Sequence, residues 1–111
     1  MATVAGSFTA TNQSATFVPI ASARSTTNAF NIFLYGTAVA TVQLERSFDQ
    51  GTTWTKIYAA SVQLYKWAYD GSTLINISES MEEPEQGMQY RLNCTAYTSG
   101  TLSYRISQGL Q

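Results

Sequence analysis

Alternation of apolar and polar residues is the sequence feature that most constrains the fold. Between Met88 and Ala96 every second residue is apolar, and residues 101–107 repeat this pattern after Thr98-Ser99-Gly100. An extended strand with one buried and one solvent-facing side has this period of two, whereas a helix has a period of 3.6 residues. The two runs therefore predict a β-hairpin with its turn at the glycine.

The rest of the chain has the same character and predicts an all-β fold. About eight short strands with turn signals between them are typical of an antiparallel β-sandwich or a jelly roll. Asp70-Gly71 is expected to form a second hairpin turn, because both of its positions tolerate a positive φ. Residues 1–111 are expected to form a single β domain, with residues 1–11 as a candidate extended N-terminal arm. The other expected strands are residues 7–11, 14–20, 30–35, 39–48, 54–58, 62–69 and 72–78.

The phase of the alternation also predicts which side chains lie in the core. Apolar residues that share one face of their strand are expected to be buried together. The predicted core consists of Ile32, Leu34, Val42, Leu44, Trp54, Tyr90, Leu92, Cys94, Leu102, Tyr104 and Ile106.

Charge is sparse, which argues against several classes of partner. Charged residues make up 12% of the chain, against about 25% in ordinary globular proteins. The formal net charge is −1, and the six basic residues are scattered, so no basic stripe for nucleic acid is visible. No apolar run is long enough for a transmembrane helix, and the N-terminus does not read as a signal peptide. We expect neither a nucleic-acid partner nor a membrane partner, and synthesis in a cytoplasm.

The sequence offers no catalytic, cofactor-binding or metal-binding constellation, so we expect no enzyme. The chain has no histidine, which removes the usual base for a nucleophile and the commonest metal ligand. Cys94 is the single cysteine and occupies an inward position of a predicted strand, so it reads as a small buried residue. The four glutamates of residues 79–85 could suggest paired glycosidase carboxylates, but their spacing around Pro84 favours a solvated acidic loop.

A local motif at residues 47–54 fits the Asp-box form S-x-D-x-G-x-T-W. An aspartate in such a turn accepts hydrogen bonds from backbone amides, the glycine supplies a positive φ, and the tryptophan folds back over the hairpin. The motif is similar to that of sialidases and other sugar-handling β-propellers, but it occurs once here, in a chain too short for a propeller. We therefore predict a turn-stabilising role for Ser47, Asp49, Gly51, Thr53 and Trp54.

Tyr65, Trp67 and Tyr69 form a row of aromatic side chains on one face of a predicted strand. Such a row can cover the core, can anchor a protein contact, or can stack against sugar rings. We favour core packing first, a protein contact second and sugar binding third, and the row is a candidate interface.

Three stretches together resemble small virion proteins of tailed phages. They are residues 30–36, residues 41–54 with their "RSFDQGTTW" segment, and residues 90–101 with the sequence "YRLNCTAYTSGT". The nearest resemblance is to the small capsid decoration proteins, also called staple or cement proteins, of short-tailed Salmonella phages. The similarity covers residues 28–108.

The resemblance implies a jelly-roll-like structural protein on the outer surface of a virion. Such a protein would clamp neighbouring major capsid subunits, as homodimers on two-fold positions. The segments expected to reach the shell are residues 2–11 and residues 21–28, which are rich in small residues. A carbohydrate-binding or receptor-binding module of a phage tail or head fibre is the alternative, and a glycosidase fragment is a more distant one.

Overall fold

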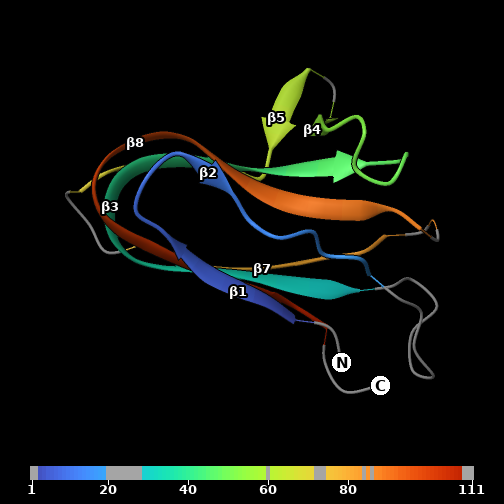
Figure 1. The fold of residues 1–111 in the computed structure, drawn as a ribbon, viewed down its shortest axis with the longest axis horizontal. Coiled ribbons are helices and arrows are strands. Elements are labelled where there is room, and N and C mark those ends of the chain that lie inside the picture. Colours follow the sequence, from blue (N-terminus) through green and yellow to red (C-terminus); the bar gives the residue numbers. More distant parts are fainter. Residues whose placement is uncertain are drawn as a thin grey trace.

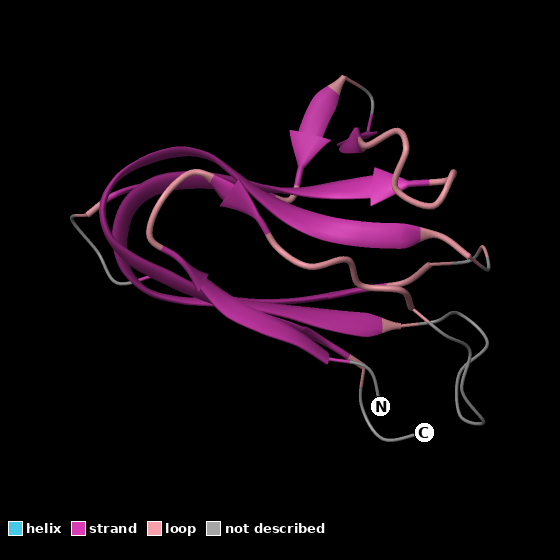
Figure 2. Cartoon of the chain, viewed as in Figure 1, coloured by secondary structure: helices cyan, strands magenta, loops and turns pink. Residues whose placement is uncertain are grey.

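The computed structural model describes residues 3–19, 29–59, 61–71, 75–83, 85 and 87–108 of the chain. The described part is all-β, and its eight strands form one antiparallel sheet (Figures 1 and 2). This confirms the predicted fold class. The strands are β1 (Thr3–Phe8), β2 (Asn12–Gln13), β3 (Phe30–Ser47), β4 (Thr55–Ala59), β5 (Val62–Leu64), β6 (Lys66–Asp70), β7 (Ile75–Met81) and β8 (Gln89–Ser107).

Two long strands, β3 and β8, build the sheet and also fold it into two layers. They pair antiparallel from Asn31↔Ser107 to Ser47↔Gln89 and bend together, so that the two halves of each strand lie one above the other (Figure 1). In the lower layer β1 and β7 flank the pair, whereas β2, β4 and β6 flank it in the upper layer. A single folded sheet thereby produces a sandwich-like body.

The predicted C-terminal hairpin is wrong, because residues 89–107 form one continuous strand. The pairing with β3 skips a residue of β8 at two places, between Val39 and Ala40 and again between Thr41 and Val42. Bulges of this kind bend a strand and increase its twist. The segment around Gly100 is therefore a bend that β8 shares with β3, and the chain does not reverse there.

Two bulges on one strand also explain why the predicted buried face is still correct. One extra residue moves the following side chains to the opposite face, and a second extra residue moves them back. Leu92 and Cys94 before the bulges therefore face the same interior as Leu102, Tyr104 and Ile106 after them.

Glycines at the bend allow the close approach of β3 and β8. Gly36 has a φ of +116°, and a Cβ there would lie 2.6 Å from the carbonyl oxygen of Thr101. Gly100 has a φ of +86°, and a Cβ there would collide with the carbonyl oxygen of Thr37. Only glycine combines this backbone conformation with the missing side chain.

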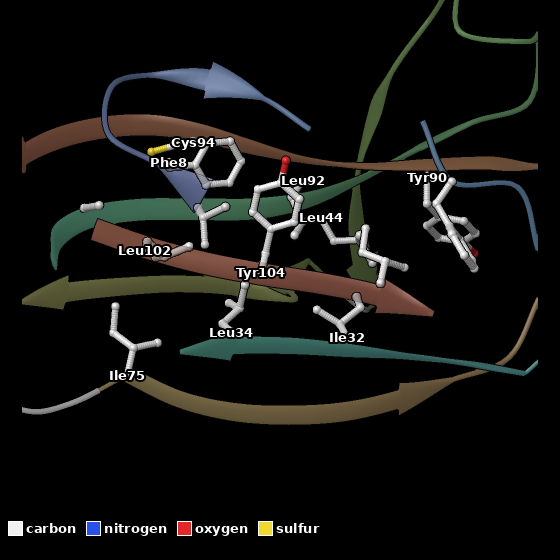
Figure 3. Close-up of a cluster of buried hydrophobic side chains, with 14 of the residues drawn as sticks. Phe8, Ile32, Leu34, Leu44, Ile75, Tyr90, Leu92, Cys94, Leu102 and Tyr104 are labelled. Atoms are coloured by element: carbon white, nitrogen blue, oxygen red, sulfur yellow. The ribbon is translucent and has the colours of Figure 1, made fainter. Parts of the chain in front are cut away.

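The core lies between the two layers, and Figure 3 shows part of it. Every predicted core residue is buried except Trp54, which is half-buried because its ring lies at the outer turn that follows β3. Tilted ring contacts link Phe30 to Phe17 and Tyr90, with centroids 5.2 and 4.8 Å apart. Further buried apolar residues, outside the predicted core, are Phe8, Phe17, Phe30, Ala38, Ala40, Ile75, Met81 and Met88.

The predicted hairpin at Asp70-Gly71 is also wrong. β6 pairs with residues 39–43 of β3 and β7 pairs with residues 30–36, both antiparallel, so the chain keeps its direction past Gly71. Gly71, which has a positive φ, directly follows β6 in the interval between two strands that both pair with β3. The predicted strand at residues 62–69 is likewise interrupted at Tyr65, where φ is +57°.

In the part of the N-terminal stretch that the structure describes, the chain is paired with the sheet and is not a free arm. β1 pairs with β8 through six residues, from Thr3↔Ser107 to Phe8↔Leu102. Phe8 is 2% exposed and stacks on Tyr104 with the ring centroids 4.8 Å apart. Small side chains suit this strand because Tyr104 covers the backbone at Gly6. The second expected arm, residues 21–28, lies outside the described residues.

Residues 14–19, the described part of the strand expected at residues 14–20, follow β8 without forming a strand. Phe17 and Tyr90 exchange backbone hydrogen bonds of 2.8 Å in each direction, as an isolated bridge. The Leu92 amide donates a 2.9 Å hydrogen bond to Ser14 Oγ. The N-terminal segment therefore covers the edge of β8 along both layers.

Candidate functional site

A hollow of about 610 Å³ opens between the two layers on the side of β4 and β7. Residues of both layers form its walls, so the folding of the sheet creates it. The lining residues are Arg46, Ile57, Tyr65, Ser80, Met81, Glu82 and Tyr90.

An ion pair with a completely buried carboxylate lies beside this hollow. Arg46 holds Glu83 with two hydrogen bonds, from Nε to Oε1 and from Nη2 to Oε2, each 2.7 Å long. The Tyr90 hydroxyl donates a third hydrogen bond of 2.7 Å to Oε1, and the Glu85 amide donates a fourth of 2.9 Å to Oε2. Both carboxylate oxygens are thus saturated, as a buried charge requires.

The prediction that the acidic residues 79–85 form a solvated loop is therefore wrong at Glu83, whose side chain is 0% exposed. Residues 79–81 belong to β7, and Glu83 is buried two residues after this strand ends. Burial and the adjacent Glu83 carboxylate raise the pKa of the Tyr90 hydroxyl far above its ordinary value. Tyr90 therefore remains a hydrogen-bond donor in alkaline solution.

The aromatic row is only half-buried and belongs to the margin of the core. Tyr65, Trp67 and Tyr69 all pack against the hydrophobic cluster. Tyr65 and Trp67 contact each other at a centroid distance of 6.3 Å, and Tyr65 also lines the hollow. The backbone of Tyr65 has a φ of +57°, which is rare for a bulky residue and marks local strain. The structure thus brings one member of the predicted row to the hollow.

The Asp-box residues form a compact turn at the end of β3. Ser47 Oγ donates to Asp49 Oδ1 at 2.8 Å and accepts the Gly51 amide at 2.9 Å. Asp49 Oδ1 also accepts the Thr53 amide at 2.8 Å, and hydrogen bonds from Thr53 hold the pKa of the Asp49 carboxyl below its usual range. Trp54 lies under the Arg91 guanidinium, 4.4 Å from the ring centroid. These contacts are internal to the turn and its neighbouring strand.

A polar ladder crosses the outer face of the upper layer, and sequence reasoning missed it. Glu45 is 7% exposed and pairs with Arg91 Nε at 2.7 Å. The Gln43 and Asn93 amides donate to Glu45 Oε2 at 2.7 and 2.9 Å. Gln63 of β5 reaches Gln43 at 3.1 Å. The period-two pattern placed these positions toward solvent and gave no sign that their neighbours cover them.

This ladder should make stability depend on pH through Glu45. Burial acts to raise the pKa of the Glu45 carboxyl, but hydrogen bonds from Asn93, Gln43 and Arg91 outweigh it and lower the pKa below its ordinary 4.5. A lowered pKa stabilises the fold at pH values above the unfolded-state pKa, and this stabilisation is lost as the pH falls through the folded-state pKa.

We expect Glu45→Gln to cost about 1.5–3 kcal/mol at neutral pH, because it removes hydrogen bonds to a charge. The difference from the wild type should shrink as the pH falls below about 4.5. Urea unfolding at neutral and acidic pH measures both values. Glu79→Gln changes an exposed carboxylate of β7 and is the matched control, with an expected change below about 0.5 kcal/mol. A Glu45→Gln deficit that stays constant with pH would contradict the account.

The β4–β5 hairpin extends beyond the upper layer (Figure 1), and it bears exposed apolar side chains on both of its faces. β4 pairs with β3 through Thr55 and Lys56 alone, and β5 pairs with β4. Tyr58 is 57% exposed, Val62 62% and Leu64 38%. Other large exposed apolar residues among those described are Val18, Tyr35 and Phe48.

Two classes of site are not found in the described part of the chain. It holds no group of three or more His, Cys, Asp or Glu residues placed to bind a metal ion. Among the same residues, no helix has the length and apolar character needed to cross a bilayer. Comparison of the sequence with models of known families and with curated proteins, and of the structure with solved structures, finds no match.

Proposed function

We propose that the protein is a structural virion protein that decorates the outside of a phage capsid and staples neighbouring major capsid subunits. The observation that carries this proposal is the β4–β5 hairpin, on which Val62 and Leu64 share one face and are 62% and 38% exposed. Apolar groups in such a position mark a surface that a partner covers. The partner in this proposal is the major capsid protein, and the protein attaches to it as a homodimer.

The character of the remaining surface supports the proposal. With 12% charged residues and a net charge of −1, the protein has little self-repulsion to oppose dense packing of many copies on a shell. The resemblance of residues 28–108 to capsid decoration proteins supports the same function. The proposed role needs no catalytic group, cofactor or nucleic-acid partner.

The pairing of the N-terminal stretch with β8 moves the proposed shell contact to another segment. Residues 3–8 already pair with β8, and Phe8 is in the core, so this stretch cannot leave the domain without cost. The β4–β5 hairpin joins β3 by a short backbone pairing, by the Gln63–Gln43 hydrogen bond and by Ile57, which packs against the core. A partner can cover its exposed side chains without any unfolding of the core. We therefore assign the shell contact to the hairpin.

Co-sedimentation with expanded empty phage capsids tests the proposal. The wild-type protein should sediment with the shells, and Val62→Ser combined with Leu64→Ser should weaken attachment about tenfold to a hundredfold. Val62 is 62% exposed and Leu64 is 38% exposed, so together they can bury about one side chain's worth of apolar surface on binding, which contributes about 1.5–3 kcal/mol. The double variant should melt within a few degrees of the wild type because both side chains are exposed.

Tyr35→Ser is the matched control, since Tyr35 is 54% exposed but lies on β3 in the other layer. It should bind shells as the wild type does. If the hairpin variant saturates shells at the original affinity, the hairpin is not the contact. If the wild type binds none of the shells, the proposed function fails.

A further inference from the structure

We propose that the hollow beside Arg46 binds a neutral sugar, one or two pyranose rings in size. Ile57 of the β4–β5 hairpin lines this hollow, but the exposed hairpin residues Tyr58, Val62 and Leu64 do not. Sugar binding is measured on the protein without shells, so its outcome is separate from that of capsid attachment. The volume of the hollow, about 610 Å³, lies within the range of about 300–1,000 Å³ that is usual for small-molecule sites.

The charges around the hollow favour a neutral ligand. The positive charge of Arg46 is already compensated by Glu83, through contacts as short as 2.6 Å. Glu82, which also lines the hollow, is exposed and adds a negative charge. A phosphate or carboxylate would therefore meet a paired cation and a repelling carboxylate. A ligand without charge avoids both penalties.

The polar groups of the hollow match hydroxyl groups that both donate and accept hydrogen bonds. A guanidinium carries five N–H groups in a rigid fork, and the Arg46 side chain remains 35% exposed although Glu83 holds its inner edge. Glu82 supplies carboxylate oxygens as acceptors at the rim. Adjacent hydroxyls of a sugar ring can accept from the first group and donate to the second.

The walls supply the apolar surface that a sugar ring needs. Tyr65 and Tyr90 are aromatic, and Ile57 and Met81 are aliphatic. Tyr65 is kept at the hollow by a strained backbone with a φ of +57°, although a glycine or asparagine would fit that conformation better. The Tyr65 carbonyl accepts the Leu44 amide at 2.9 Å, which fixes the strained segment to β3. Strain of this kind often accompanies a binding role.

Titration of the full chain with neutral sugars, followed by amide chemical shifts in NMR, tests the proposal. The probes are methyl glycosides of glucose, galactose and rhamnose, together with maltose and lactose, through the millimolar range. At least one should shift the amides of Tyr65, Met81 and Glu82 while leaving those of β1 unchanged. Glucuronate and glucose 6-phosphate, as charged analogues, should bind about tenfold more weakly than the neutral ligand.

Tyr65→Gly is the decisive variant, because glycine accepts the positive φ and keeps the backbone while the ring is lost. Its affinity for the sugar should fall about tenfold, whereas the exposed control Tyr35→Gly should bind as the wild type does. The proposal is overturned if no sugar of the panel shifts these amides. It is equally overturned if Tyr65→Gly binds like the wild type, or if the charged analogues bind more tightly.

Discussion

Replacement of Arg46 by methionine is expected to lower the free energy of unfolding by about 3–5 kcal/mol at neutral pH. The change leaves the Glu83 carboxylate, which is 0% exposed, with hydrogen bonds from the Tyr90 hydroxyl and the Glu85 amide but without its cation. A buried charge that loses its partner keeps its desolvation cost without the compensating attraction. Urea or thermal unfolding measures the loss directly.

Two further variants separate the buried pair from a general effect of removing a charge. Arg105→Met removes an exposed arginine from β8 and should change stability by less than about 0.5 kcal/mol. The double variant Arg46→Met with Glu83→Gln removes both charges and should recover part of the loss. If Arg46→Met costs less than about 1 kcal/mol, the buried Glu83 carboxylate does not need the Arg46 charge, which contradicts this prediction.

The second large effect is expected at Phe8, where Phe8→Ala should cost about 3–5 kcal/mol. The side chain is 2% exposed, and its stacking on Tyr104 joins β1 to the core. Ser7→Ala, at an exposed neighbour on the same strand, should change stability by less than about 0.5 kcal/mol. Equilibrium unfolding of both variants tests whether β1 belongs to the domain. A Phe8→Ala loss as small as that of the control would support a detachable arm.

Periodicity predicted the fold class and most of the core because it reports which side of a strand is buried. The faces of Ile32, Leu34 and Val42 on β3 follow directly from their spacing of two. On β8 the prediction also held past the bend, since two bulges restore the phase that one would have reversed. Burial on one face is thus visible in the sequence even where the path of the chain is not.

The path itself could not be predicted, because a glycine with a positive φ serves a turn and a bend equally well. Gly100 and Gly71 both looked like hairpin turns, but in each case β3 runs alongside and the chain continues in the same direction. The decision depends on a partner strand that is distant in the sequence. Local patterns carry no information about that partner.

The candidate site was hidden for a similar reason. Glu83 has the local sequence of a solvated acidic loop, and its burial depends on Arg46, which lies 37 residues earlier in the chain. The exposed side chains of the β4–β5 hairpin also looked like ordinary strand residues, because nothing in a period of two tells an exposed apolar face from a buried one. The hydrogen bonds of the Asp-box turn join residues within six positions of one another, so a local motif can describe them.

The most direct test of the central claim is a reconstruction by electron cryomicroscopy of expanded phage shells incubated with the protein. The account predicts added density on the outer surface, at positions shared by neighbouring capsid subunits, with the β4–β5 hairpin against the shell and Val62 and Leu64 covered. The account is contradicted if no density is added, or if bound copies hold the hairpin away from the capsid with these side chains in solvent.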